Sequence, residues 1–223
     1  MPRRILKQIL EIVRLAKRIS QFRLFTKKEQ ENLSLVFSDG EKDGISPELK
    51  LKVYEIILLL RSRIKRPFGL LVVLGWQREW NEKYAAISDI DQDIFRNHHF
   101  DLGKHSLNQC TEAIKKTIDF DGAILVNKEG IILGSGAYLE NVRPKEVSKI
   151  VHSSDHTKDL SEAFGFAKKV HTRHLAAIAA SYRLKNTTVF VLSEEDGSVR
   201  IFERGKIVWS TIPSEIQRII ESQ

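Results

Sequence analysis

The chain is organised around the stretch His171-Thr172-Arg173-His174-Leu175-Ala176-Ala177-Ile178-Ala179-Ala180-Ser181. A spacing of i, i+3, i+4 and i+7, typical of one buried helical face, relates Leu175, Ile178, Ala179 and Tyr182. We predict Thr172 as the N-cap, which places Arg173 and His174 in the first turn. The free N–H groups and positive end of a helix bind anions, and these two side chains add charge-assisted donors. The stretch predicts a phosphate site, with a solvated helix start as the equally weighted alternative.

Apolar runs on both sides of this helix predict strands. In chain order they are residues 68–74, 84–88, 120–127, 131–139, 188–193, 199–203 and 206–209. Lys128-Glu129-Gly130 is the predicted hairpin turn between the strands 120–127 and 131–139. The glycines inside the strand 131–139 indicate that another group approaches its backbone closely. We expect residues 140–169 to form a polar connection.

Helical patterns occupy the remaining segments. Ser46-Pro47 predicts a helix start, and that helix runs to about Lys65. Further helices are expected over 106–117 and from Pro213 onward. Between the first two of these helices, the adjacent histidines His98 and His99 are predicted to lie on a loop or at the surface, because neighbouring strand residues point to opposite faces and make no metal site.

The N-terminal segment is predicted to be a two-helix appendage. Residues 5–19 form a basic amphipathic pattern, and Thr26 with Glu29 resembles a capping box that opens a second helix ending near Phe37. The polar, glycine-containing residues 38–44 indicate a linker, so we divide the chain into 1–45 and 46–223. The apolar stripe is expected to pack on this protein or a second copy, with an anionic membrane surface or nucleic acid as the less favoured alternative.

Composition sets broad limits on function. The 223 residues are 42% hydrophobic, enough for a sizeable core, and the net charge of +7 fits an anionic ligand such as a nucleotide or nucleic acid without requiring one. Cys110, the single cysteine, has no disulfide partner in the chain, which fits a reducing compartment. The apolar runs are far shorter than the ~20 residues of a membrane span, and the N-terminus lacks a signal peptide pattern. A cytoplasmic location is expected.

Three short motifs carry a family resemblance. Asp121-Gly122-Ala123, Thr172-Arg173-His174 and Ser193-Glu194-Glu195, in this order and separated by strand and helix patterns, resemble the diadenylate cyclase domain family. The resemblance covers about residues 47–209 and is strongest from Asp121 onward. It implies an α/β fold, with a mixed β-sheet flanked by helices. It also implies an enzyme that condenses two ATP molecules into cyclic di-AMP and two pyrophosphates, with Mg²⁺ or Mn²⁺, across two protomers that meet face to face.

The resemblance also implies roles for individual residues. Asp121 would hold the metal and activate the hydroxyl, Gly122 would let the nucleotide approach, and Thr172, Arg173 and His174 would hold phosphates. Tyr138 would stack on adenine. The other residues implied at the nucleotide are Ala123, Gly136, Leu139, Ser193, Glu194 and Glu195. For the two glutamates an ordinary hairpin turn is the competing interpretation.

Two positions depart from the family pattern. Leu175 stands where the family usually has a second arginine, and His171 stands where it usually has glycine. One competing hypothesis is therefore a nucleotide-binding sensor with weak or absent catalysis on the same fold. A basic nucleic-acid-binding protein is a second one, disfavoured because the appendage contains no recognisable nucleic-acid module.

Overall fold

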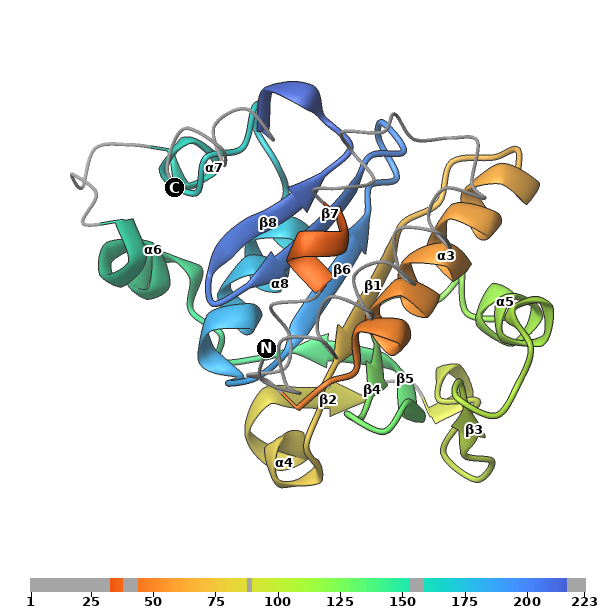
Figure 1. The fold of residues 1–223 in the computed structure, drawn as a ribbon. Helices are drawn as coiled ribbons and strands as arrows, with labels where there is room; N and C mark the ends of the chain where they lie inside the picture. Colours follow the sequence, from red (N-terminus) through yellow and green to blue (C-terminus); the bar gives the residue numbers. More distant parts are fainter. Residues whose placement is uncertain (1–32, 38–43, 88–89, 153–158, 216–223) are drawn as a thin grey trace, which may run out of the picture.

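The protein contains a mixed sheet covered by helices on both faces (Figure 1). The computed structural model describes residues 33–37, 44–87, 90–152 and 159–215. Its strands are β1 Leu70–Leu74, β2 Ala85–Ile87, β3 Phe100–Asp101, β4 Ala123–Val126, β5 Ile131–Leu139, β6 Thr188–Leu192, β7 Val199–Glu203 and β8 Lys206–Ser210. The sheet order is β2-β5-β4-β1-β6-β7-β8, with β3 paired to β5. β1 and β4 are parallel and the other pairs are antiparallel, so the predicted α/β class and mixed sheet are confirmed.

The described helices are short apart from two. They are α3 Pro47–Arg63, α4 Asn81–Tyr84, α5 Leu107–Lys115, α6 Pro144–His152, α7 Leu160–Ala163 and α8 Thr172–Arg183, with 3-10 turns η2 Arg78–Trp80 and η3 Ile90–Gln92. None of the helices in the described ranges combines the length and the apolar character that a bilayer crossing requires.

The two faces of the sheet bury separate hydrophobic clusters. On β1, Leu70, Val72 and Leu74 pack in the cluster that contains the apolar side chains of α3, whereas Leu71 and Val73 pack in the cluster that contains those of α8. All five residues are buried, which explains the unbroken apolar run of this strand. α3 and α8 therefore cover opposite faces.

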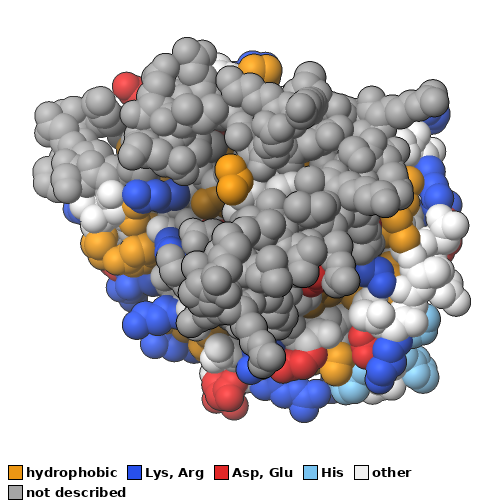
Figure 2. Space-filling model, viewed as in Figure 1, with side chains coloured by type: hydrophobic (Ala, Val, Ile, Leu, Met, Phe, Trp, Pro, Cys, Tyr) orange, Lys and Arg blue, Asp and Glu red, His pale blue; other side chains and the backbone are white. Residues whose placement is uncertain are grey.

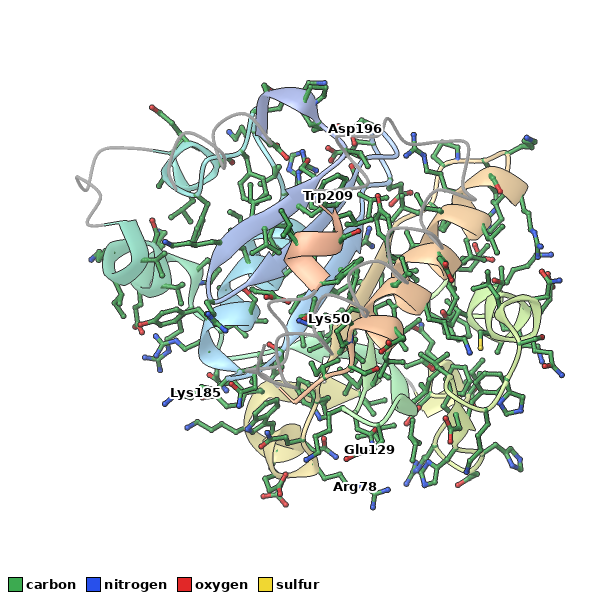
Figure 3. All side chains as sticks on the ribbon, viewed as in Figure 1. Lys50, Arg78, Glu129, Lys185, Asp196 and Trp209 are labelled. Atoms are coloured by element: carbon green, nitrogen blue, oxygen red, sulfur yellow. The ribbon has the colours of Figure 1, made fainter. Side chains whose placement is uncertain are left out.

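A buried ion pair and a buried hydrogen bond fasten α3 to the strands beneath it. Lys50, which Figure 3 labels, has its Nζ 2.6 Å from Glu203 Oε1 of β7. Trp209 of β8 donates its indole N–H to the hydroxyl of Tyr54 at 3.0 Å. Both polar contacts are satisfied within the core, so their burial carries no unpaired group.

Most predicted elements occur close to the expected bounds. The helix predicted over 106–117 is α5, with a capping box between Ser106 and Gln109, and Cys110 on it is fully buried. His98 and His99 are exposed and lie outside regular structure, as expected. A terminal helix begins at Pro213, and its continuation lies outside the described residues.

Two predictions about local structure were wrong. Residues 140–169 contain α6 and α7 rather than a continuous polar connection. The N-cap of α8 is His171 rather than Thr172, which is already helical, and the His171 side chain makes no capping hydrogen bond. The first turn of α8 therefore has no side-chain cap of its own. The N–H of His174 donates to the His171 carbonyl at 3.1 Å, so among the described residues the N–H groups of Thr172 and Arg173 are left for other partners.

The N-terminal region joins the core where it can be described. Residues 33–37 are helical, and Leu33 and Phe37 are fully buried in the α3 cluster. The Phe37 ring meets Tyr54 edge to face, with centroids 6.3 Å apart. The helix predicted over 5–19, the capping box at Thr26 and the linker residues 38–43 lie outside the described residues.

Candidate functional site

The sequence motifs converge on one cavity on the α8 face of the sheet. Its volume is about 680 Å³, within the range of roughly 300–1,000 Å³ that is usual for small-molecule sites. The lining residues come from β1, the loop before β4, the end of β5, the start of α8 and the turn after β6: Leu71, Asp121, Gly122, Ala137, Tyr138, Leu139, His171, Thr172, Arg173, His174, Ala176, Ser193, Glu194 and Glu195. Every predicted site residue lines it except Ala123 and Gly136.

Ala123 and Gly136 serve the sheet. Ala123 is fully buried and pairs with Ala137 of β5. Gly136 has a φ of +68°, and a Cβ there would lie 2.7 Å from Cβ of Gln92 in η3. The glycines of β5 do mark a close approach, as the sequence indicated, but η3 is what approaches Gly136.

The structure explains the glycine at residue 122 by a backbone contact, whereas the family resemblance implied that it lets the nucleotide approach. Its φ is +98°, and a Cβ would lie within 2.8 Å of the backbone of Gly136 and Ala137. The residue is therefore a glycine because the loop that carries Asp121 packs directly on the backbone of β5. This contact places Asp121 at the cavity edge with 74% of its side chain exposed.

Arg173 lies between two acidic side chains. Its Nη2 is 3.8 Å from Asp121 Oδ1, and its Nη1 is 3.8 Å from Glu194 Oε2. Both distances exceed the usual length of a hydrogen bond, so the pairs are loose and the guanidinium keeps donors for a ligand. Its side chain is 29% exposed. The cavity thus contains one cation flanked by two carboxylates from separate elements.

Gly69, which the sequence reasoning missed, makes room for this arginine. A Cβ at residue 69 would lie only 1.7 Å from Arg173 Nη1 and 2.7 Å from its Cζ. The guanidinium therefore rests on the backbone just before β1. No local signal marks Gly69, because the need for a missing side chain comes from a residue more than one hundred positions later in the chain.

His174 differs from its predicted role as a charged donor. It is 6% exposed, and its Nε2 lies 3.1 Å from Nη1 of Arg200 on β7. Burial, together with the charge of Arg200, lowers the pKa of His174 from 6.5 to about 4. The imidazole is therefore neutral at pH 7, and Arg173 is the cation of the α8 start.

The other motif residues occupy the turn after β6 and the end of β5. Ser193 is buried and closes the β6–β7 hairpin through backbone bonds to Ser198 at 2.8 Å and Gly197 at 3.0 Å, which explains the Ser-Glu-Glu motif as a turn. Glu195 pairs with His171 at 3.2 Å. Tyr138 is 42% exposed at the cavity wall.

Leu175 packs on the α8 cluster and does not line the cavity. Asp196, at the same turn as Glu195 (Figure 3), has a pKa lowered to about 2. Burial acts against this shift, but hydrogen bonds from the hydroxyl and backbone N–H of Ser198 outweigh it.

A divalent cation fits this site only with help from a ligand. The described residues contain no group of three or more His, Cys, Asp and Glu side chains arranged to hold a metal. Mg²⁺ is commonly bound through one or two carboxylates together with substrate phosphates. The exposed carboxylate of Asp121, with Glu194 on the other side of Arg173, fits such a site, which substrate phosphates would complete.

Comparisons with known proteins identify the family to which the chain belongs. The family model described as DisA bacterial checkpoint controller nucleotide-binding matches residues 60–207. A diadenylate cyclase of Haloferax volcanii is 26% identical over 180 residues, which are 80% of this chain and 56% of that protein, so the chain spans about half the length of this relative.

Two solved structures resemble the chain. A hypothetical membrane spanning protein from Bacillus cereus is 15% identical, with a TM-score of 0.51 over 92% of this chain and 89% of the other. A double mutant of DacA from Staphylococcus aureus is 20% identical, with a TM-score of 0.42 over 78% of this chain and 93% of the other. The family model matches more than half of the residues, so the chain belongs to the DisA bacterial checkpoint controller nucleotide-binding family, the family of diadenylate cyclase domains.

Proposed function

We propose that this protein is a diadenylate cyclase, which condenses two ATP molecules into cyclic di-AMP and releases two pyrophosphates. One observation carries the proposal: three motifs far apart in the sequence line a single cavity of nucleotide size. The relative from Haloferax volcanii supports it, because that protein is described as a diadenylate cyclase. In each half-reaction a 3′-hydroxyl releases its proton to solvent and forms a bond to the α-phosphorus of the other ATP, and the bond between that phosphorus and the leaving pyrophosphate breaks.

The residues of the cavity have distinct roles in this proposal. Arg173 binds phosphate oxygens, together with the uncapped N–H groups at the start of α8. Tyr138 offers its exposed ring to the adenine base. Asp121 holds Mg²⁺ or Mn²⁺, which when bound would neutralise phosphate charge and lower the pKa of the attacking hydroxyl. Gly122 and Gly69 act by making the positions of Asp121 and Arg173 possible.

The reaction requires two copies of the chain. The cavity of one protomer holds one nucleotide, whereas the product joins two nucleotides head to tail. We therefore propose that two protomers bring their cavities face to face, with the exposed side chains of Asp121 and Tyr138 at the border between them. Such a pairing aligns each hydroxyl with the phosphorus across the interface, which is the main requirement of an in-line displacement.

Product analysis tests the proposal directly. The purified chain is incubated with ATP and either Mg²⁺ or Mn²⁺, and chromatography measures cyclic di-AMP and pyrophosphate. We expect a rate that rises more steeply than protein concentration where dimers are scarce. Binding of ATP without product at any protein concentration would favour the nucleotide sensor raised by Leu175. The Asp121→Asn variant is the control for a contaminating activity.

A further inference from the structure

Behind His174 lies a buried polar network that the proposed reaction does not use. Arg200 on β7 is 1% exposed, and its guanidinium contacts three side chains. Nε and Nη2 donate to the two carboxylate oxygens of Glu215 at 2.9 and 3.0 Å. Nη1 lies 2.8 Å from Ser198 Oγ and 3.1 Å from His174 Nε2. The Arg200 guanidinium is thus held by the Glu215 carboxylate on one side, and on the other side it directs the Nη1 donor at the His174 imidazole.

The network has little freedom to rearrange. Glu215 also accepts hydrogen bonds from Ala167 N–H at 3.0 Å and Ser210 Oγ at 2.6 Å, so both of its oxygens are occupied. The Phe166 ring lies 5.5 Å from the Arg200 Cζ and 6.1 Å from the His174 ring. With Glu215 fully engaged and an aromatic ring against it, the guanidinium is fixed in orientation.

This geometry determines the tautomer of His174. A guanidinium donates hydrogen bonds and accepts none, so Nε2 must present its lone pair to Arg200. The proton of the neutral imidazole then resides on Nδ1. Among the described residues Nδ1 makes no hydrogen bond. It is not a buried atom either, because the only buried side-chain nitrogen or oxygen without a partner in the described part of the chain is Arg183 Nε. Because His174 lines the cavity, Nδ1 is the ring nitrogen available to a ligand.

We propose that Arg200 and Glu215 are positioning residues that hold His174 as the Nδ1–H tautomer, so that a neutral N–H donor faces the cavity. The ligand contact that follows, a bond from Nδ1–H to a phosphate oxygen, rests on the proposed function; the tautomer does not. The other charged groups that act on His174 are Asp196, Glu215 and Arg173. Nothing in the sequence motifs places Arg200 at this site, since it lies on β7, outside all three of them.

Nitrogen NMR of the imidazole tests the assignment. Long-range ¹H–¹⁵N spectra of the full chain at pH 7, with His174 identified by its loss in His174→Gln, should show the Nδ1–H pattern in the wild type. Arg200→Lys keeps a charge beside Glu215 but removes the fork, and should move the proton to Nε2. Arg183→Lys makes the same change at the other end of α8, where the arginine pairs with Glu146 at 2.6 Å, and should leave the pattern unchanged.

A second variant guards against loss of folding. Arg200→Met combined with Glu215→Leu replaces the ion pair by apolar side chains, a change that folded cores often tolerate. It should also yield Nε2–H and raise the pKa of His174 above about 4. An Nε2–H or protonated His174 in the wild type, or Nδ1–H retained in both folded variants, would overturn the proposal. ATP titrations on the same samples report separately on the nucleotide site, so a protein without cyclase activity still gives a decisive answer on the tautomer.

Discussion

Gly69→Ala is the sharpest test of the phosphate-binding role that we propose for Arg173. The added methyl group would lie 1.7 Å from Nη1, whereas ordinary van der Waals contact begins at 3.4 Å, so the guanidinium must retreat by about 1.7 Å. The obstructing atoms are the far end of a flexible side chain, which moves without disturbing the backbone. Gly69 is not among the residues with positive φ, so alanine suits its backbone conformation.

The size of the effect follows from what the displaced arginine loses. A hydrogen bond to a charged group contributes about 1.5–3 kcal/mol, which corresponds to a factor of about ten to a hundred in affinity. We therefore expect ATP to bind about tenfold to a hundredfold more weakly. Replacing glycine by alanine at a compatible position stabilises a protein by about 0.4–1 kcal/mol. The thermal midpoint should accordingly stay constant or rise while nucleotide affinity falls.

Isothermal titration with ATP and thermal melts measure the two quantities on the same samples. A double-mutant cycle with Arg173→Ala supplies the control, because a methyl group at residue 69 has no guanidinium to displace once the arginine is gone. Adding Gly69→Ala to the Arg173→Ala variant should then cause no further loss of ATP affinity. Unchanged ATP affinity in the single variant, or effects of the two substitutions that simply add, would refute the reasoning.

Three further predictions concern other parts of the molecule. Asp121→Asn should lower kcat at least about a hundredfold while ATP affinity changes little, and turnover near the wild-type rate would exclude its metal-binding role. Deleting residues 1–32 should change the number of subunits and the specific activity, whereas deleting residues 1–45 also removes Phe37 from the core and should lower the free energy of unfolding by several kcal/mol. Light scattering, product assays and melts measure these effects. An unchanged molecular mass and rate after the shorter deletion would contradict an assembly role of residues 1–32. Because the pKa of His174 falls from 6.5 unfolded to about 4 folded, its contribution to stability is complete above pH 6.5 and is lost as pH falls toward 4. The loss is about 3 kcal/mol, it should vanish in His174→Gln, and denaturant melts across this range measure it.

Most of the residues that line the cavity were predicted from the resemblance of three motifs to the diadenylate cyclase family, and these motifs sit where elements begin and end. Asp121 precedes a buried strand, Thr172 and Arg173 open a helix, and Ser193 follows a strand that is buried along its whole length. Polar groups at such points are not required by the core, so they are informative about ligands. The local pattern alone left a solvated helix start and ordinary turns as alternatives, and the family resemblance was needed to bring the three motifs together.

Helix α6 was missed for a physical reason. Its nine residues carry only one helical repeat of apolar side chains, Val147, Ile150 and Val151, and Val147 is fully buried because the helix packs on α8. Such a short helix gains most of its stability from this tertiary contact rather than from its own propensity. Gly69 and Arg200 were not predicted either, because each is important only through a contact with another part of the chain: Gly69 with Arg173, and Arg200 with His174 and Glu215.

Arg200 does carry a weak sequence signal in retrospect. Its neighbours Val199 and Ile201 belong to the α3 cluster, while Phe202, two residues on, belongs to the α8 cluster. The alternation of strand faces places Arg200 on the α8 side, the face of the cavity. An arginine inside a fully buried strand demands a buried acidic partner, which Glu215 provides.

The departure at Leu175 has a limited effect on the cavity. Leu175 packs against the α8 cluster, and the residues of the helix start that line the cavity are His171, Thr172, Arg173 and His174. The leucine therefore extends the apolar face of α8 and contributes no group to the lining. In the proposed reaction, the phosphates would be held by Arg173, the free N–H groups of the first turn and the neutral ring of His174. That set is weaker in charge than an arginine pair, so the proposed reaction depends more heavily on the carboxylate of Asp121 and its metal.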